Sequence, residues 1–322
     1  MKRFAIQWFF FVFFGLLSMH ICSQQSQLYT QFAFNKLALN PAYAGNNDHF
    51  TLTGIYRDQW SGFPGSPKTQ NLTINSPRIL SNAGLGLNLE RFSVGITRIV
   101  NISGQYAYKI RMDDLTLSFG LSTTFRNMVR DFTDPRLVAL EDINRDGAII
   151  ADRLSTYLFN VGTGIYINNE RFFAGISTPG LLKTDLILTT DEKESRSPFV
   201  RQINFMSGGI IPLSEMIDLT GQFLIRWAEQ SSIGVDINAG FLLDNRYRFA
   251  LSYRSGGSSV DIGESLGLIF GFDIGKRLMI GISYDYTLTG IRQFDQGSLE
   301  FLAAYKIIGS VEKGRIANPR YF

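Results

Sequence analysis

The sequence predicts an all-β fold, a transmembrane antiparallel β-barrel of about 14 strands with short periplasmic turns and longer extracellular loops. Three observations predict this class. The chain begins with an export leader. Apolar and polar residues then alternate with a period of two along most of the remainder. The connections between these segments are alternately short and long. No run of about 18 apolar residues follows the leader, so the pattern predicts no membrane helix.

Residues 1–23 have the organisation of a secretory signal peptide. Lys2 and Arg3 precede a mainly apolar run from Phe4 to Leu17, and Ser23 supplies a small residue at the predicted cleavage site. This run is shorter than the roughly 20 residues that a membrane-spanning helix needs. Cleavage removes Cys22, one histidine and two of the 31 basic residues, so 29 basic residues remain against 28 acidic ones and the net charge is +1.

This composition excludes several classes of protein. Without cysteine the exported chain has no thiol nucleophile, disulfide framework or Cys/His zinc site, and His49 is its one histidine. A net charge near zero argues against nucleic-acid binding. We find no complete phosphate-binding loop, no G-x-S-x-G motif and no paired-carboxylate site. The sequence therefore predicts neither an enzyme nor a bound cofactor.

Alternation of apolar and polar residues defines the strands. Between 277 and 288, for example, Ile280 and Ile282 alternate with Gly281 and Ser283. We expect strands at 49–57, 68–76, 83–91, 99–110, 114–125, 156–167, 170–177, 199–210, 216–227, 232–243, 246–254, 261–272, 277–288 and 297–307. Most are near the 9–11 residues, roughly, that a tilted strand needs to cross a bilayer.

A soluble β-sandwich would alternate as well, because one face of each of its sheets packs against the other sheet. Three features favour lipid instead: long strands, a second face rich in Gly, Ser, Thr and Asn, and aromatic residues near strand ends, as in interfacial girdles. These aromatic residues are Tyr56, Trp60, Tyr106, Tyr108, Trp227, Tyr253, Tyr284 and Tyr286. We therefore expect the apolar face to contact hydrocarbon and the polar face to enclose a lumen.

The connections predict the orientation and the domain boundaries. Every second connection is short, as in periplasmic turns, whereas the others include the long segments 126–155 and 178–198. An even number of strands leaves both termini in the periplasm. We therefore expect an N-terminal periplasmic segment at 24–48, followed at 49–322 by an outer-membrane β-barrel with a periplasmic C-terminal tail.

Charged residues on the polar face leave two alternatives open. They could line an ion-selective pore, or pair with one another and close the lumen, and we favour pairing. The residues are Lys109, Arg226, Asp236, Arg246, Arg248, Arg254, Asp285, Glu300 and Lys306.

The loop at 126–155 contains the beginning of a calcium-binding pattern. Asp142, Asn144 and Asp146 precede Gly147 at the spacing of the first ligands in an EF-hand loop. The twelfth position, which should be acidic, is Arg153, and Asp152 lies one place early. We favour a solvated polar loop and keep a calcium site as the alternative.

The N-terminal region carries the most specific motifs of the chain. Residues 31–45 read QFAFNKLALNPAYAG, residues 56–60 read YRDQW, and residues 65–70 read GSPKTQ. Together with the signal peptide, the length and the barrel pattern, these motifs resemble the PorP/SprF family, outer-membrane proteins of the type IX secretion system of the Bacteroidetes. The resemblance covers essentially the whole exported chain.

The resemblance implies a function that composition cannot show. Such a barrel supports the secretion or surface attachment of cargo proteins that bear a type IX C-terminal signal, among them gliding-motility adhesins. Its partners would be this cargo, other type IX components in the periplasm, and outer-membrane lipid. The alternative is a porin-like or fatty-acid-type outer-membrane transporter, which a conducting lumen or an apolar tunnel would favour.

For the segment 24–48 we keep two interpretations: it plugs the barrel mouth, or it presents residues to a partner. An Asn-Pro turn next to an aromatic residue marks its most specific part. The candidate partner-binding residues are Phe32, Phe34, Asn40, Pro41, Tyr43, Arg57 and Trp60. We further expect the loops 58–67, 126–155 and 178–198 to meet the cargo outside the cell.

Overall fold

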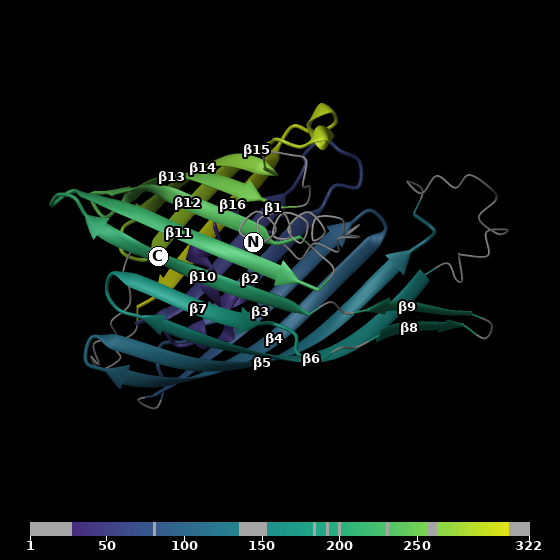
Figure 1. Ribbon diagram of the computed structural model, residues 1–322, viewed down its shortest axis with the longest axis horizontal. Coiled ribbons are helices and arrows are strands. Elements are labelled where there is room, and N and C mark those ends of the chain that lie inside the picture. Colours follow the sequence, from purple (N-terminus) through teal and green to yellow (C-terminus); the bar gives the residue numbers. More distant parts are fainter. Residues whose placement is uncertain are drawn as a thin grey trace, which may run out of the picture.

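The computed structural model describes residues 28–79, 82–134, 153–182, 185–190, 193–198, 201–229, 232–256 and 263–308. Fourteen strands form a closed barrel in which each strand is antiparallel to both neighbours (Figure 1). Strand β1 pairs with β16 and closes the barrel, while β7 pairs with β10. The predicted transmembrane β-barrel is confirmed.

The barrel strands agree closely with the predicted ones. They are β1 (Phe50–Asp58), β2 (Lys68–Asn75), β3 (Ala83–Val94), β4 (Thr97–Met112), β5 (Leu115–Asp131), β6 (Arg153–Asn168), β7 (Phe172–Thr178), β10 (Gln202–Pro212), β11 (Ile217–Ala228), β12 (Gly234–Leu243), β13 (Tyr247–Ser255), β14 (Ser265–Ile274), β15 (Leu278–Thr287) and β16 (Ser298–Ile307). A short 3-10 helix, η4 (Gly290–Gln293), lies between the last two.

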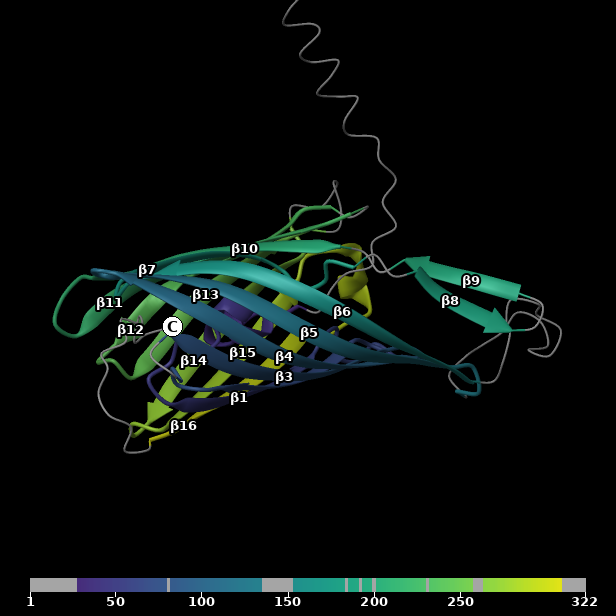
Figure 2. The ribbon, with the colours of Figure 1, turned by 90° about the horizontal axis from the view of Figure 1, so that it is seen from below.

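The structure differs from the prediction in two long connections. Strand β5 extends to Asp131 within the predicted loop 126–155, because inward-facing Met128 packs with Leu158 and Ile99 and continues the barrel wall. The predicted loop 178–198 contains a two-stranded sheet, β8 (Asp185–Thr190) and β9 (Lys193–Pro198), which projects away from the barrel (Figure 2). The period-two criterion misses such a hairpin, since a strand outside a half-buried sheet need not alternate.

Polarity is reversed relative to a soluble protein. On β5, outward-facing Phe119 and Leu121 are 43% and 62% exposed, whereas inward-facing Ser118 and Ser122 are buried. The same arrangement recurs around the barrel, so the apolar face contacts hydrocarbon. Outward-facing aromatic residues lie at both ends of the strands: Tyr56, Trp227, Tyr284 and Tyr286 at the extracellular end, and Tyr106 and Tyr108 at the periplasmic end. These positions confirm the predicted girdles.

The periplasmic connections are tight turns. Asp244 and Asn245, between β12 and β13, both have positive φ, 52° and 50°, which is the two-residue hairpin conformation that matches strand twist. No helix among the described residues is long and apolar enough to cross a membrane.

Candidate functional site: the N-terminal segment in the lumen

The barrel encloses part of its own chain. Residues 28–46, here called the lumenal segment, lie inside the barrel (Figures 1 and 2) and include three 3-10 helices, η1 (Phe32–Phe34), η2 (Lys36–Ala38) and η3 (Pro41–Tyr43). Phe32 and Ala42 are 2% and 0% exposed, and they form a core with inward-facing side chains of the wall. A hydrophobic core thus exists within a barrel whose wall is mostly polar on its inner face.

The Asn-Pro turn has a clear local cause. Asn40 caps η3, its side-chain Oδ1 accepting a hydrogen bond from the backbone N of Ala42 at 2.9 Å. Pro41 occupies the first helical position, where a missing N–H costs nothing. Tyr43 then packs edge-to-face against Tyr166 of β6, with ring centroids 5.4 Å apart. The turn thereby orients an aromatic side chain toward the wall.

A row of small residues receives this turn. Its members lie directly opposite one another across β3 to β7, on the inner face; they are Gly84, Ala107, Gly120, Gly164 and Ser177. A Cβ on Gly120 would overlap the backbone of Pro41 and Ala42, and one on Gly84 would overlap that of Ala44 and Gly45. Residues 40–45 therefore lie backbone to backbone against the wall, which only glycine permits at these positions.

Hydrogen bonds fix the segment on this row. Asn40 Nδ2 donates to the carbonyl of Ile165 at 3.0 Å, and Ser177 Oγ donates to the carbonyl of Leu39 at 2.7 Å. Gly45, with φ of 68°, donates its N–H to Asn75 Oδ1 at 2.8 Å. These bonds to a wall of strands satisfy backbone groups that would otherwise be buried without partners.

A cluster of buried charges holds the other end of the segment. Arg57 Nη2 lies 2.7 Å from Asp285 Oδ2, and Arg57 Nη1 lies 3.2 Å from Glu300 Oε2. Asp236 pairs with Arg254 at 2.5 Å and with Arg226 at 2.7 Å. A buried ion is stable only when it is paired and hydrogen-bonded. Removal of any one of these residues would therefore leave the charge of its partner uncompensated.

Thr30 lies at the centre of this cluster. Its backbone N donates to Glu300 Oε2 at 2.9 Å, and its hydroxyl donates to Asp285 Oδ2 at 2.6 Å. Arg57 Nη1 donates to the same hydroxyl at 2.8 Å, and Asn238 Nδ2 donates to the Thr30 carbonyl at 2.9 Å. These wall side chains therefore anchor the segment to β1, β12, β15 and β16, so the two ends of the barrel sequence meet at Thr30.

The alternative of paired lumenal charges is confirmed for Arg226, Asp236, Arg254, Asp285 and Glu300. Arg248 pairs with Asp273 at 2.7 Å, and buried Lys109 donates to Asn46 Oδ1 and Ser118 Oγ at 3.3 and 3.2 Å. The expectation for Arg246 was wrong: it is exposed at the periplasmic end, over the rings of Tyr247 and Phe272. Lys306 lies opposite Thr51 on the inner face, but it is exposed at the periplasmic mouth of the barrel. They lie at strand termini, where the alternating pattern no longer implies burial.

The lumenal segment runs through the barrel along its length. Thr30 contacts Arg57 and Glu300, near the extracellular ends of β1 and β16. Asn47 forms a bridge with Pro77, next to the periplasmic turn after β2. The first described residues therefore lie closer to the cell exterior than the predicted periplasmic placement of 24–48 implies.

Two polar side chains of the segment are buried in the lumen. The Lys36 ammonium lies 4.2 Å from the ring centroid of Phe173 and 5.3 Å from that of Tyr43, so two cation–π contacts stabilise it. The Tyr29 hydroxyl donates a hydrogen bond to Glu90 of β3.

The predicted site residues lie in separate parts of the structure. Asn40, Pro41 and Tyr43 lie on the glycine row, and Arg57 belongs to the charge cluster. Phe32 is buried in the core, Phe34 is partly exposed, and Trp60 lies in an extracellular loop, its N donating to Ser298 Oγ at 3.1 Å. They do not form one surface, and a role in partner binding stays a prediction.

The wall residues that receive the segment were not among the predicted site residues. Thr30 belongs to no sequence motif, but the glycines could have indicated the seat: Gly84, Gly120 and Gly164 occupy inward-facing positions on β3, β5 and β6, with the small residue Ala107 on β4 between the first two. A glycine row on the polar face of adjacent strands indicates close approach of another backbone.

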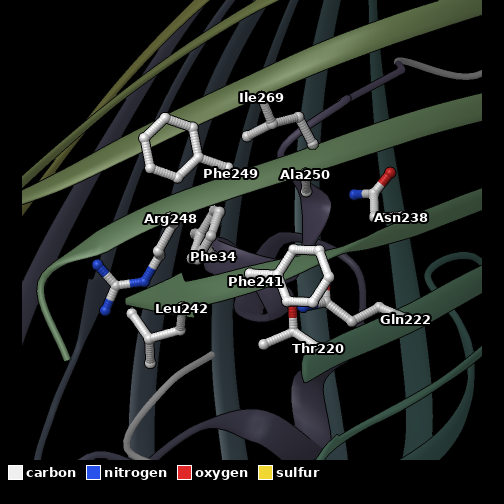
Figure 3. A pocket seen from close by; sticks show the side chains of 10 residues that line it. All are labelled: Phe34, Thr220, Gln222, Asn238, Phe241, Leu242, Arg248, Phe249, Ala250 and Ile269. Carbon is white, nitrogen blue, oxygen red and sulfur yellow. The ribbon is translucent and has the colours of Figure 1, made fainter. Parts of the chain in front are cut away.

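A small cavity remains beside the segment. Phe34 lines it together with Gln222, Asn238, Arg248 and Ile269, which come from strands β11 to β14, and Figure 3 shows Phe34 next to Arg248. The cavity measures about 20 Å³, enough for about one water molecule.

Three expectations lie outside the described residues: the signal peptide at 1–23, the calcium candidates Asp142, Asn144 and Asp146, and the C-terminal tail beyond residue 308.

Comparison with known proteins identifies both a family and a fold. The type IX secretion system membrane protein PorP/SprF family matches residues 21–305. No curated protein matches the sequence. The CymD monoaromatic hydrocarbon channel is similar in structure, with a TM-score of 0.50 and 12% identity over 88% of this chain and 94% of that one.

Two further outer-membrane barrels are similar. A FadL homologue of Pseudomonas aeruginosa has a TM-score of 0.47 and 12% identity, covering 89% of this chain and 96% of its own. Omp33 of Acinetobacter baumannii has a TM-score of 0.45 and 7% identity, covering 82% and 100%. Identities this low concern the fold and not the function.

Proposed function

Because the chain belongs to the type IX secretion system membrane protein PorP/SprF family, we propose that it supports the secretion or surface attachment of cargo proteins bearing a type IX C-terminal signal. It is an outer-membrane component of that system, and the family implies interaction with other secretion components. The finer proposal is that cargo, among it gliding-motility adhesins, is bound at the barrel and not conducted through it.

The observation that supports this proposal is the occupied lumen. The lumenal segment is anchored at one end by Thr30 within the charge cluster and at the other by Asn40 on the glycine row. The cavity beside it has room for about one water molecule. A porin or a fatty-acid-type transporter needs a continuous path, so these contacts favour a plug at 24–48 and a binding function for the barrel.

We place cargo binding at the extracellular end, in the loops 58–67, 126–155 and 178–198. Strands β8 and β9 give the last of these a folded hairpin that stands off the barrel (Figure 2). A two-stranded hairpin is only marginally stable alone in water, and a partner strand or surface would stabilise it.

Affinity purification of the tagged protein from native membranes tests the proposal. We expect type IX components and a secreted cargo protein to co-purify, and deletion of residues 185–198 to reduce the cargo but not the periplasmic components. Recovery of the barrel without any secretion component would contradict the proposal.

Conductance measurements distinguish this proposal from the transporter alternative. In planar bilayers we expect the intact protein not to conduct ions, and a folded variant that lacks residues 28–46 to conduct them. Heat-modifiable migration on gels establishes that the variant is folded. Open channels in the intact protein would favour the porin-like alternative.

A further inference from the structure

Three basic residues lie together on the outer surface of the barrel. They are Lys68 at the start of β2, Arg91 on β3 and Arg98 on β4. Lys68 lies opposite Ser93, and Ser93 lies opposite Arg98, so these three occupy one row across the strands. Arg91 is two residues from Ser93 on the same face, one row nearer the membrane.

This register places the three cations at the corners of a small triangle. Neighbouring strands lie about 4.8 Å apart, and residues i and i+2 of one strand about 6.7 Å apart. Lys68 and Arg98 are thus separated by about 10 Å at their Cα atoms, and each is about 8 Å from Arg91. Lysine and arginine side chains are long enough to converge on one anionic group from these positions.

The positive charge of the triangle is only partly compensated: Asp58 lies beside Lys68, and Asp131 lies on the same face, two residues from the Val129 that is opposite Arg98. Arg91 and Arg98 are exposed, and neither forms an ion pair with any residue that the structure describes. Lys68 lies 3.6 Å from Asp58, but its side chain is 49% exposed and the pair is weakened by water. Glu90, the acidic neighbour of Arg91 in the sequence, faces the lumen and is buried.

The surface changes abruptly below the triangle. The row of Arg91 carries Tyr56 and Tyr157, as expected at a membrane interface. The next row inward contains only apolar residues, namely Leu72, Leu89, Ile102, Phe125 and Phe159. The cations therefore lie one to two rows above the surface that contacts hydrocarbon.

The triangle belongs to the outer leaflet. Residues 95–96, which connect β3 to β4, lie at the same end of the barrel as the long loops, and Gly95 N donates to the carbonyl of Gly65 in the loop between β1 and β2 at 2.9 Å. Arg98 is thus two residues from the extracellular tip of its hairpin. The triangle therefore lies just beyond the apolar rows on the extracellular side, in the interfacial zone where lipid headgroups are found.

We propose that Lys68, Arg91 and Arg98 bind a phosphate group of lipid A, with its acyl chains lying against the apolar row of Leu72, Leu89 and Ile102. Charge-assisted hydrogen bonds from guanidinium and ammonium groups to phosphate supply the affinity. The adjoining hydrocarbon surface selects a lipid over a soluble phosphate, because both parts of the ligand are then bound at once. The site is independent of the secretion role.

Native mass spectrometry of the detergent-purified full-length protein with added bisphosphorylated lipid A tests the site. The variant Lys68→Gln/Arg91→Gln/Arg98→Gln should bind at least about tenfold more weakly, since it removes all three charge-assisted contacts to the phosphate. The matched control Arg111→Gln/Lys276→Gln/Arg277→Gln removes three exposed charges at the periplasmic end, and it should bind as the unaltered protein does.

Two ligand controls identify what is bound. Lipid A stripped of its phosphates should bind all three proteins equally and weakly, and inorganic phosphate at millimolar concentration should not compete. Equal lipid A affinity of the two triple variants would overturn the proposal. Competition by inorganic phosphate would overturn the assignment to a lipid. Heat-modifiable migration on gels verifies that each variant is folded.

Discussion

Replacing Arg57 by methionine should destabilise the barrel by about 3–5 kcal/mol, the usual cost of leaving a buried charge without its partner. Arg57 is 2% exposed and lies 2.7 Å from Asp285 and 3.2 Å from Glu300. Asp285 would keep Arg254 at 3.7 Å. Glu300, which is fully buried, would keep only hydrogen bonds from the backbone of Thr30 and Gln31.

Urea unfolding in detergent micelles, followed by tryptophan fluorescence, measures the change in free energy. Trp60, three residues from Arg57, is a suitable reporter. The matched control is Lys68→Met on the neighbouring strand, whose pair with Asp58 at 3.6 Å is exposed and should contribute less than about 1 kcal/mol.

A second substitution distinguishes loss of charge balance from loss of packing. In the variant Arg57→Met/Glu300→Gln no unpaired carboxylate remains at position 300, and we expect at least half of the lost stability to return. An Arg57→Met variant as stable as Lys68→Met would refute the reasoning, as would a double variant less stable than the single one.

Two further predictions follow from the lumenal segment and the loops. Gly120→Val should cost about 1–3 kcal/mol of stability through overlap with Ala42 and should speed amide exchange at residues 40–45. The control Gly104→Val lies on the outer face of the adjacent strand, where an added Cβ is 3.7 Å from Thr123 Oγ1, and it should do neither. Equal exchange in both variants would contradict backbone-to-backbone contact at Gly120. Calorimetric titration with calcium tests the loop of Asp142, Asn144 and Asp146, where Arg153 at the twelfth position predicts no binding heat.

Much of the barrel was predictable because its causes are local. A strand with one lipid-facing and one lumenal face must alternate with a period of two, and this pattern located all fourteen barrel strands. The hairpin of β8 and β9 was not predicted, since neither of its strands belongs to the barrel wall. The lumenal charges were recognised, but their partners were not, because Arg57 and Glu300 are 243 residues apart in the chain.

The sequence alone determined the strands, their inner and outer faces and the resemblance to a secretion family, since alternation and motifs lie in consecutive residues. Only the tertiary structure decided that residues 28–46 thread the lumen and where they are held. The row of Gly84, Gly120 and Gly164 exists only in the register of four neighbouring strands, and the cluster around Thr30 exists only once β1 has closed on β16. Register and closure depend on many weak contacts between distant residues, and no short stretch of sequence contains them.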